Sequence, residues 1–181
     1  TSDAYTNAII DWQEKRNHVE GLTAECIGYE NGVLGGVNVC SESIFTARRQ
    51  RATSQPYLCW ITNSILNGGY KIVHSPLVQD ENGVWRMDYE DMDRKLKKHR
   101  IHVAVFCNPH NPCGRVWERE ELEKAMEVYR NNQCVVISDE IWSDIILEGN
   151  QHIPLASVSE DAKNRTISFY APSKTFSLAG L

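Results

Sequence analysis

Residues 101–114 read IHVAVFCNPHNPCG, an apolar run that ends in a loop of asparagine and proline. Residues 118–131 follow with their apolar side chains on one stripe, the pattern of an amphipathic helix. A second apolar run, Cys134–Ser138, comes next and leads directly into Asp139. A strand, a helix and a second strand in this order are typical of a parallel sheet. We therefore predict an α/β fold, with a mostly parallel sheet covered by helices on both faces.

The other predicted elements extend this pattern in both directions along the chain. Ser2 or Asp3 can cap a helix that runs to Arg16. The further ranges are a strand at 26–29, a turn at 30–32, helices at 33–45, 57–66 and 88–98, and strands at 71–76 and 166–170. The stretch Thr46–Gln55 contains three arginines and almost nothing apolar, so we predict a solvated loop there.

Composition excludes several classes of protein. The chain has 181 residues and a net charge of -5, which speaks against nucleic acid as the main partner. No apolar run approaches the roughly 20 residues that span a bilayer, so no membrane partner is expected. The six cysteines form no C-x-x-C pair, which favours a reducing, cytoplasmic location over a disulfide framework. His110 has no second ligand at a metal-binding spacing, so no metal site is predicted.

Four unusual segments fall at the predicted carboxyl ends of strands, where α/β sheets bind ligands. They are the glycine-rich turn Gly32–Gly36, the loop 108–114, Asp139 and Lys174. Taken singly, each has an ordinary explanation as a turn, a cap or a solvated charge. Together they offer a helix N-terminus for a phosphate, an amide donor, a carboxylate for a pyridine nitrogen and an amine for an aldehyde. Those are the requirements of pyridoxal 5'-phosphate (PLP).

Three segments carry a resemblance to a known family. They are 108–117 (NPHNPCGRVW), 138–144 (SDEIWSD) and 171–176 (APSKTF). They resemble the signature segments of fold-type-I PLP enzymes, and most of all the aminotransferase-like cystathionine β-lyases, which are carbon–sulfur lyases. The resemblance implies that residues 1–181 are a partial PLP-binding large domain. It also implies that an N-terminal segment and a small C-terminal domain are missing from this chain.

The resemblance assigns a role to each candidate site residue. Lys174 would hold the cofactor covalently and act as the catalytic base, and Asp139 would pair with the pyridine nitrogen. Asn111 would hydrogen-bond the phenolate oxygen, and Ile141 would pack on one face of the ring. The backbone N–H groups of Val33 and Leu34 and the hydroxyl of Ser173 would bind the phosphate. Tyr57 would stack on the other ring face, a role for which Trp60 also competes.

The sequence departs from the family pattern in three places. Relatives carry an apolar strand where this chain has Arg48–Gln55, so that strand is displaced, shortened or absent. Ser177 stands where the subgroup usually has asparagine. The arginine that grips the substrate carboxylate would lie beyond Leu181.

The resemblance implies a β-lyase acting on cystathionine or related cysteine conjugates, which releases a thiol, pyruvate and ammonia. An aminotransferase would use the same residues and stays open as an alternative. A truncated relative that binds PLP or a partner without turnover is the alternative from another class. The resemblance also implies a small amino-acid substrate and a homodimer.

Overall fold

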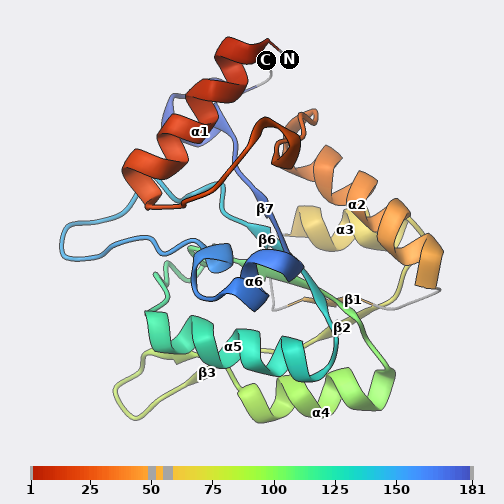
Figure 1. Cartoon of the computed structure of the whole chain (residues 1–181). Coiled ribbons are helices and arrows are strands. Elements are labelled where there is room, and N and C mark those ends of the chain that lie inside the picture. The colour runs from red at the N-terminus through yellow and green to blue at the C-terminus, as the bar shows by residue number, and fades with distance from the viewer. Residues whose placement is uncertain (1, 49–51, 55–58, 180–181) are drawn as a thin grey trace.

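The computed structural model describes residues 2–48, 52–54 and 59–179 and has a five-stranded sheet at its centre (Figure 1). The strands in spatial order are β2 (Ile72–His74), β1 (Ala52–Ser54), β5 (Val103–Cys107), β6 (Val135–Asp139) and β7 (Thr166–Phe169). Each neighbouring pair in this sheet runs parallel. The predicted α/β fold class with a parallel sheet is therefore confirmed.

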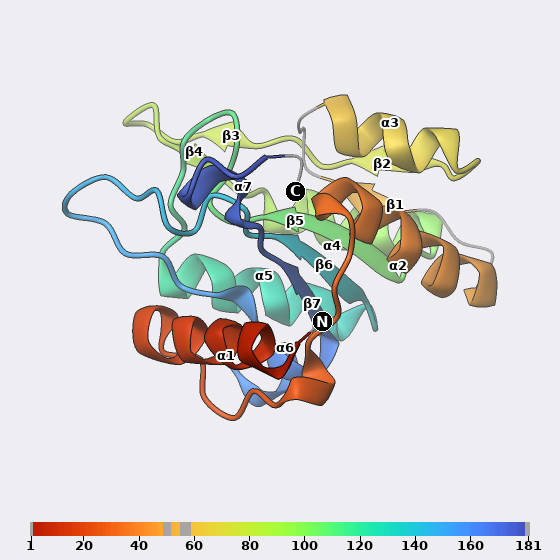
Figure 2. The same cartoon turned by 90° about the horizontal axis from the view of Figure 1, so that it is seen from above.

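Helices cover both faces of the sheet, and the alternation of side chains along β5 shows how. Val103 and Val105 point into a core shared with α2 (Gly32–Arg48) and α3 (Cys59–Asn67). Ala104 and Phe106 point into the opposite core, shared with α4 (Tyr89–His99) and α5 (Arg119–Asn131). Figures 1 and 2 show these helix layers with the sheet between them. A strand buried on both faces needs a continuous apolar run, which is what β5 has.

The long helices begin where the sequence offers caps. Ser2 caps α1 (Asp3–Asn17) and the Asp88 side chain accepts the Asp91 N–H at the start of α4. Glu118 and Glu121 form a capping box at the start of α5. The predicted helices in these three places are confirmed, to within a residue or two at their ends.

Smaller elements complete the chain. Strands β3 (Val78–Gln79) and β4 (Trp85–Arg86) form an antiparallel hairpin. Helix α6 (Glu160–Arg165) precedes β7, and the four-residue helix α7 (Pro172–Thr175) follows it. Two short 3-10 helices lie at Ala24–Cys26 (η1) and Leu155–Ser157 (η2).

The strand predicted at residues 26–29 is wrong. Cys26 ends η1, and the Ile27 N–H donates to the Ala24 carbonyl, 3.2 Å away, so the backbone bonds locally. Gly28 and Tyr29 are exposed and belong to no strand. A short apolar run forms a strand only where a neighbour can pair with its backbone groups.

The solvated loop predicted at residues 46–55 is also wrong for the residues that the structure describes. Helix α2 continues to Arg48, and Ala52–Ser54 form β1 between β2 and β5. Of the alternatives, a shortened strand fits: three small residues complete the sheet. Arg49, Arg51 and Gln55 lie outside the described residues.

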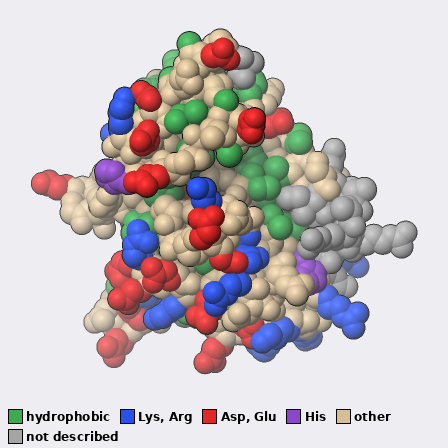
Figure 3. All heavy atoms as spheres, viewed as in Figure 1, with side chains coloured by type: hydrophobic (Ala, Val, Ile, Leu, Met, Phe, Trp, Pro, Cys, Tyr) green, Lys and Arg blue, Asp and Glu red, His purple; other side chains and the backbone are tan. Residues whose placement is uncertain are grey.

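Charged side chains of both signs are interspersed over the part of the surface formed by α4 and α5 (Figure 3). Ion pairs one helical turn apart, such as Lys97–Asp93 at 2.6 Å, contribute to this pattern. Among the described residues, no helix is both long enough and apolar enough to span a bilayer.

Candidate active site

Three neighbouring strands end together at one edge of the sheet. In the parallel register Cys107 lies opposite Asp139, and Asp139 lies opposite Phe169. The hydrogen bonds continue just past the strands: Asn108 N–H donates to the Asp139 carbonyl and Glu140 N–H to the Phe169 carbonyl, each at 2.9 Å. The segments that leave this edge are those that contain Asn111, Ile141 and Lys174.

Asp139 is a buried carboxylate at the end of β6. Burial raises its pKa to about 6, an effect that the Ile141 N–H partly opposes and the charge of Glu140 reinforces. The Ile141 N–H donates to Oδ1 at 3.1 Å. Within the described part of the chain no residue donates a hydrogen bond to Oδ2. A cationic partner at Oδ2 would offset the cost of burying the charge.

Asn111 lies in the loop that follows β5. A hydrogen bond from the Gly114 N–H to the His110 carbonyl, at 2.8 Å, closes this loop, and His110 pairs with Arg115 across its base. The Asn111 N–H points to Cys107 Sγ at 3.5 Å, which ties the residue back to the strand end. Its side-chain amide forms no hydrogen bond to another described residue and is half-buried.

Lys174 lies on α7, just beyond β7, and its side chain is exposed. Its Nζ is 5.4 Å from the centroid of the Trp142 ring, a cation–π contact. Trp142 follows Ile141 in the segment after β6, so the amine is directed toward the segment that begins at Asp139. Ser173 precedes Lys174 in the same short helix and is half-buried.

The N-terminus of α2 lies on the same side of the sheet. Gly32 opens the helix with φ at +75°, a conformation that favours glycine. Val33 is buried in the core cluster against which Ile141 and Phe169 pack, while Leu34 is exposed. A Cβ on Gly36 would lie 2.1 Å from Phe169 Cε1, so the glycine lets α2 approach β7 closely. The first N–H groups of the helix are thereby held near the strand ends, where they can hold an anion.

The structure thus brings most of the predicted residues to one edge of the sheet, with one exception. Asp139 is the last residue of the middle one of three strands that end in register. The segments just past these strands contain Asn111, Ile141, Ser173 and Lys174. Tyr57 lies outside the described residues, and its role in ring stacking stays a prediction.

Sequence reasoning missed the buried side chain of Glu140, next to Asp139. Its carboxylate accepts hydrogen bonds from Ser138, Ser168, Tyr170 and the Leu155 N–H, at 2.5 to 3.2 Å. His152 Nε2 lies 2.8 Å from the same carboxylate. Successive residues along a strand point to opposite faces of the sheet. This alternation could have indicated from the sequence that Glu140 and Asp139 point in opposite directions and have different roles.

His110 is a buried side chain in the loop that follows β5. Burial lowers its pKa to about 4, so the ring is neutral at physiological pH. Its Nδ1 lies 2.9 Å from Cys113 Sγ. Among the described residues, no three His, Cys, Asp or Glu side chains are grouped closely enough to hold a metal ion.

Residues 2–181 match the family of class I and II aminotransferases. Cystathionine beta-lyase PatB of Bacillus subtilis is 34% identical over 97% of this chain and 45% of its own length. Glutamate-pyruvate aminotransferase AlaA of Escherichia coli K12 is 29% identical over 96% of this chain and 41% of its own. The PLP-bound C–S lyase of Staphylococcus hominis superposes with a TM-score of 0.92 at 30% identity, over 100% of this chain and 46% of that one.

The chain therefore spans less than half the length of these relatives. The family match, in contrast, covers almost every residue and includes all the strand ends described above. The chain belongs to the class I and II aminotransferase family.

Proposed function

We propose that this chain is the cofactor-binding unit of a PLP-dependent carbon–sulfur β-lyase. The observation that carries the proposal is Asp139, a buried carboxylate with a raised pKa at the end of β6, whose Oδ2 accepts no hydrogen bond from a described residue. A protonated pyridine nitrogen is the kind of cation that such a carboxylate favours. The similarity to a cystathionine β-lyase and to a C–S lyase supports the choice of reaction.

The residues fit the group that the family implies. PLP needs an amine for its aldehyde, a carboxylate for its ring nitrogen, a donor for its phenolate oxygen and N–H groups for its phosphate. Asp139 ends β6, and Lys174 and Asn111 lie just beyond the neighbouring strands, which end in register with it. The start of α2 adjoins the same edge. Ser173 would add a hydroxyl for the phosphate, and Ile141 an apolar surface for the ring.

The proposed chemistry is a proton transfer followed by loss of a thiolate. When bound, PLP supplies an electron sink and an aldehyde that takes the substrate's amino group. Lys174 Nζ, displaced by that amino group, accepts the proton from the substrate's Cα. Asp139 stays negative beside the ring nitrogen, and Asn111 fixes the orientation of the ring. Cleavage of the bond between Cβ and sulfur then releases the thiol, and water completes the conversion of the remaining three-carbon unit to pyruvate and ammonia.

An aminotransferase is the second candidate, because AlaA is also similar over nearly the whole chain. The two reactions differ in where the proton goes after Lys174 has taken it. In an aminotransferase Lys174 would pass that proton to the bound cofactor, which would keep the substrate's amino group, and water would release the keto acid with its sulfur still attached.

The test supplies cystathionine to the protein at its native length, reconstituted with PLP, and measures pyruvate. The lyase proposal expects pyruvate, ammonia and a free thiol in equal amounts without any added keto acid. Lys174→Ala should reduce the rate at least about 100-fold, the usual contribution of a general base. Keto acid that forms only when a second keto acid is present would favour the aminotransferase, and no turnover of either kind would favour a non-catalytic relative.

The proposal also includes a small amino acid as substrate, a homodimer and a cytoplasmic location. The substrate and the homodimer rest on the resemblance to the family, and the location rests on the six cysteines that form no C-x-x-C pair. Light scattering on the native-length protein tests the dimer, and cell fractionation tests the location.

A further inference from the structure

We propose that Asp144 is a positioning residue that holds the helix with Lys174 at the cofactor site. This inference rests on the proposed function, since it concerns the amine that would hold PLP. Asp144 comes five residues after Asp139, in the segment that leaves the end of β6. Its carboxylate links three separate parts of the chain.

Both carboxylate oxygens of Asp144 are occupied. Oδ2 accepts a hydrogen bond from Thr175 Oγ1 at 2.8 Å. Oδ1 accepts from Arg16 Nε at 2.7 Å and from Trp12 Nε1 at 3.2 Å. The side chain of Asp144 is only 10% exposed, so these bonds are partly shielded from water. Hydrogen bonds to an ionised group in such a setting are among the stronger ones in proteins.

These contacts determine where Lys174 lies. Thr175 is its immediate neighbour on α7, and Trp142, which lies under the Lys174 amine, is two residues from Asp144. The short helix is therefore held at two points along the 139–144 segment, at Trp142 and at Asp144. Because Asp139 begins that same segment, Asp144 fixes the amine relative to the carboxylate that would bind the ring nitrogen.

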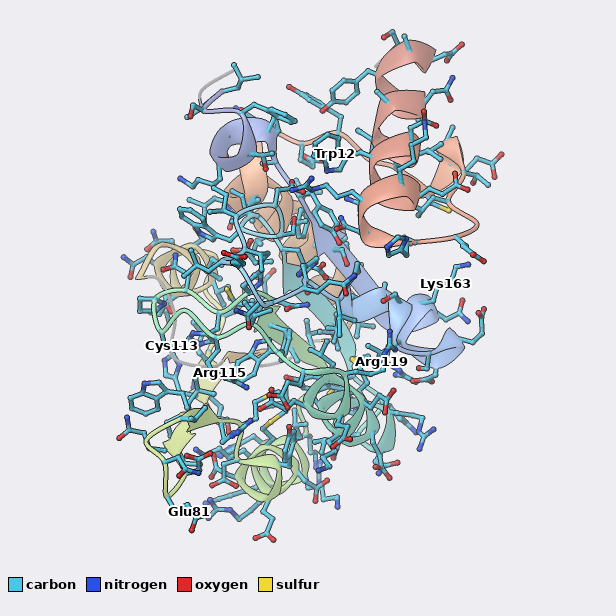
Figure 4. The ribbon with its side chains drawn as sticks, turned by 90° about the vertical axis from the view of Figure 1, so that its left-hand side faces the viewer. Trp12, Glu81, Cys113, Arg115, Arg119 and Lys163 are labelled. Carbon is cyan, nitrogen blue, oxygen red and sulfur yellow. The ribbon has the colours of Figure 1, made fainter. Side chains whose placement is uncertain are left out.

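Packing alone holds α7 weakly. None of its four residues is buried, and the following Phe176 is 53% exposed. The free energy of local opening is small for an element with few buried contacts, unless hydrogen bonds hold it in place. Phe176 does contact the Trp12 ring edge to face, at 5.4 Å between centroids. Trp12 lies between α1 and α7 (Figure 4). Its Nε1–H donates to Asp144, so α1 also holds the carboxylate that binds α7.

The first test compares Thr175→Val with Thr175→Ser in the native-length protein. Valine keeps the shape of threonine and loses the donor, whereas serine keeps the donor. Each protein is loaded with PLP, reduced with borohydride and digested, and mass spectrometry measures the fraction of PLP fixed on Lys174. We expect PLP affinity and trapped fraction to fall at least about 10-fold in Thr175→Val, in line with one lost hydrogen bond to a charged group. Thr175→Ser should retain most of both.

The second test needs no cofactor. Amide hydrogen exchange of residues 173–176 in the cofactor-free protein reports directly how firmly α7 is held. Thr175→Val and Asp144→Asn should speed this exchange several-fold, while exchange in β5 and β6 stays as in the parent protein. Equal acceleration throughout the sheet would mean a general loss of stability and would overturn the positioning role.

Helix α1 offers a matched control. Lys15 and Arg16 are adjacent and each is ion-paired, but Lys15 pairs with Asp11 on its own helix at 2.6 Å whereas Arg16 reaches Asp144. Arg16→Gln should loosen α7 and weaken PLP trapping, and Lys15→Gln should change neither. Both sites are exposed, so both variants should fold.

The outcomes separate this inference from the proposed function. If the parent protein fixes PLP on Lys174 and Thr175→Val does so equally well with unchanged exchange, Asp144 has no positioning role and the proposed function stands. If the parent protein fixes no PLP on Lys174, the proposed function fails and the inference fails with it.

Discussion

Asp139 illustrates how a proposed cofactor-binding residue can work against the stability of its own fold. Its carboxylate is buried, and desolvation raises its pKa from 3.8 to about 6. The folded protein therefore holds a proton on this group more tightly than the unfolded chain does. The contribution to stability is present below about pH 4 and is lost as the pH rises through about 6.

The first prediction concerns Asp139→Asn in the cofactor-free protein. Asparagine is neutral at every pH and can still accept the Ile141 N–H, so it avoids the cost of a buried charge. The rise in pKa to about 6 corresponds to roughly 3 kcal/mol as an upper bound. We expect the free energy of unfolding in denaturant to be higher than that of the parent protein by up to this amount at pH 7.5. At pH 4 the two should be nearly equal.

Asp80→Asn is the control for this prediction, because the environment of Asp80 acts in the opposite direction. The Val84 N–H and then Arg86 lower the pKa of the Asp80 carboxyl. Asp80→Asn should therefore lower the free energy of unfolding at pH 7.5. A loss of stability in both variants at that pH would contradict the account of Asp139.

The second prediction concerns Glu140, which is fully buried and binds groups on β6, β7 and η2. Glu140→Gln replaces one oxygen by an amide that meets hydrogen-bond donors, so a buried network is left partly unsatisfied. We expect a loss of about 2–4 kcal/mol in the free energy of unfolding. Glu148→Gln, at an exposed position, should change it by less than about 0.5 kcal/mol. Equal effects of the two would contradict the network.

The contact between α2 and β7 shows how one element is held against another at the site. Gly36 lies where any larger residue would meet the Phe169 ring, whereas a Cβ on Gly35 would find its nearest neighbour 3.9 Å away. The two glycines are adjacent in the same helix. They therefore separate the effect of packing from that of helix propensity.

The third prediction compares Gly36→Ala with Gly35→Ala. Gly36→Ala should lower the free energy of unfolding by about 1–3 kcal/mol and weaken PLP binding, since it pushes the start of α2 away from the strand ends. Gly35→Ala should raise the free energy of unfolding by up to about 1 kcal/mol, because alanine favours helix. Thermal unfolding and titration with PLP measure both effects. A destabilising Gly35→Ala together with a neutral Gly36→Ala would contradict the packing described here.

Elements with strong local signals could be predicted from the sequence, and the others could not. Helices α4 and α5 have caps and an apolar stripe, and β5 is an apolar run bounded by a loop. Strand β1 has no such signal, because Ala52–Ser54 are small and follow a run of arginines. Their place in the sheet comes from pairing with β2 and β5, which is a tertiary effect.

The same distinction applies to the site. The strand-end location of Asn111, Asp139 and Lys174 follows from the alternation of strands and helices together with the family motifs. The link from Asp144 to Thr175 joins residues 31 positions apart, and the link to Arg16 joins residues 128 apart. No local pattern encodes such contacts, so only the folded chain shows them.

At the scale of the whole molecule, binding of PLP should stabilise the fold by mass action. The fourth prediction compares PLP with pyridoxal, which lacks the phosphate. At a free concentration of about 100 times its dissociation constant, PLP should raise the free energy of unfolding by roughly 2.7 kcal/mol. The melting temperature should rise by several degrees. Pyridoxal at the same concentration should have a much smaller effect, because the N–H groups at the start of α2 would have no anion to hold. Equal shifts with the two compounds would contradict a phosphate site at α2.

The central claim is that a single amine, that of Lys174, bonds one PLP at the edge where β5, β6 and β7 end. The visible absorption spectrum of the PLP-loaded protein tests it most directly. We predict an absorption band that borohydride bleaches, present in the parent protein and in Lys163→Ala and absent in Lys174→Ala. A colourless parent protein, or a band that survives in Lys174→Ala, would contradict the account.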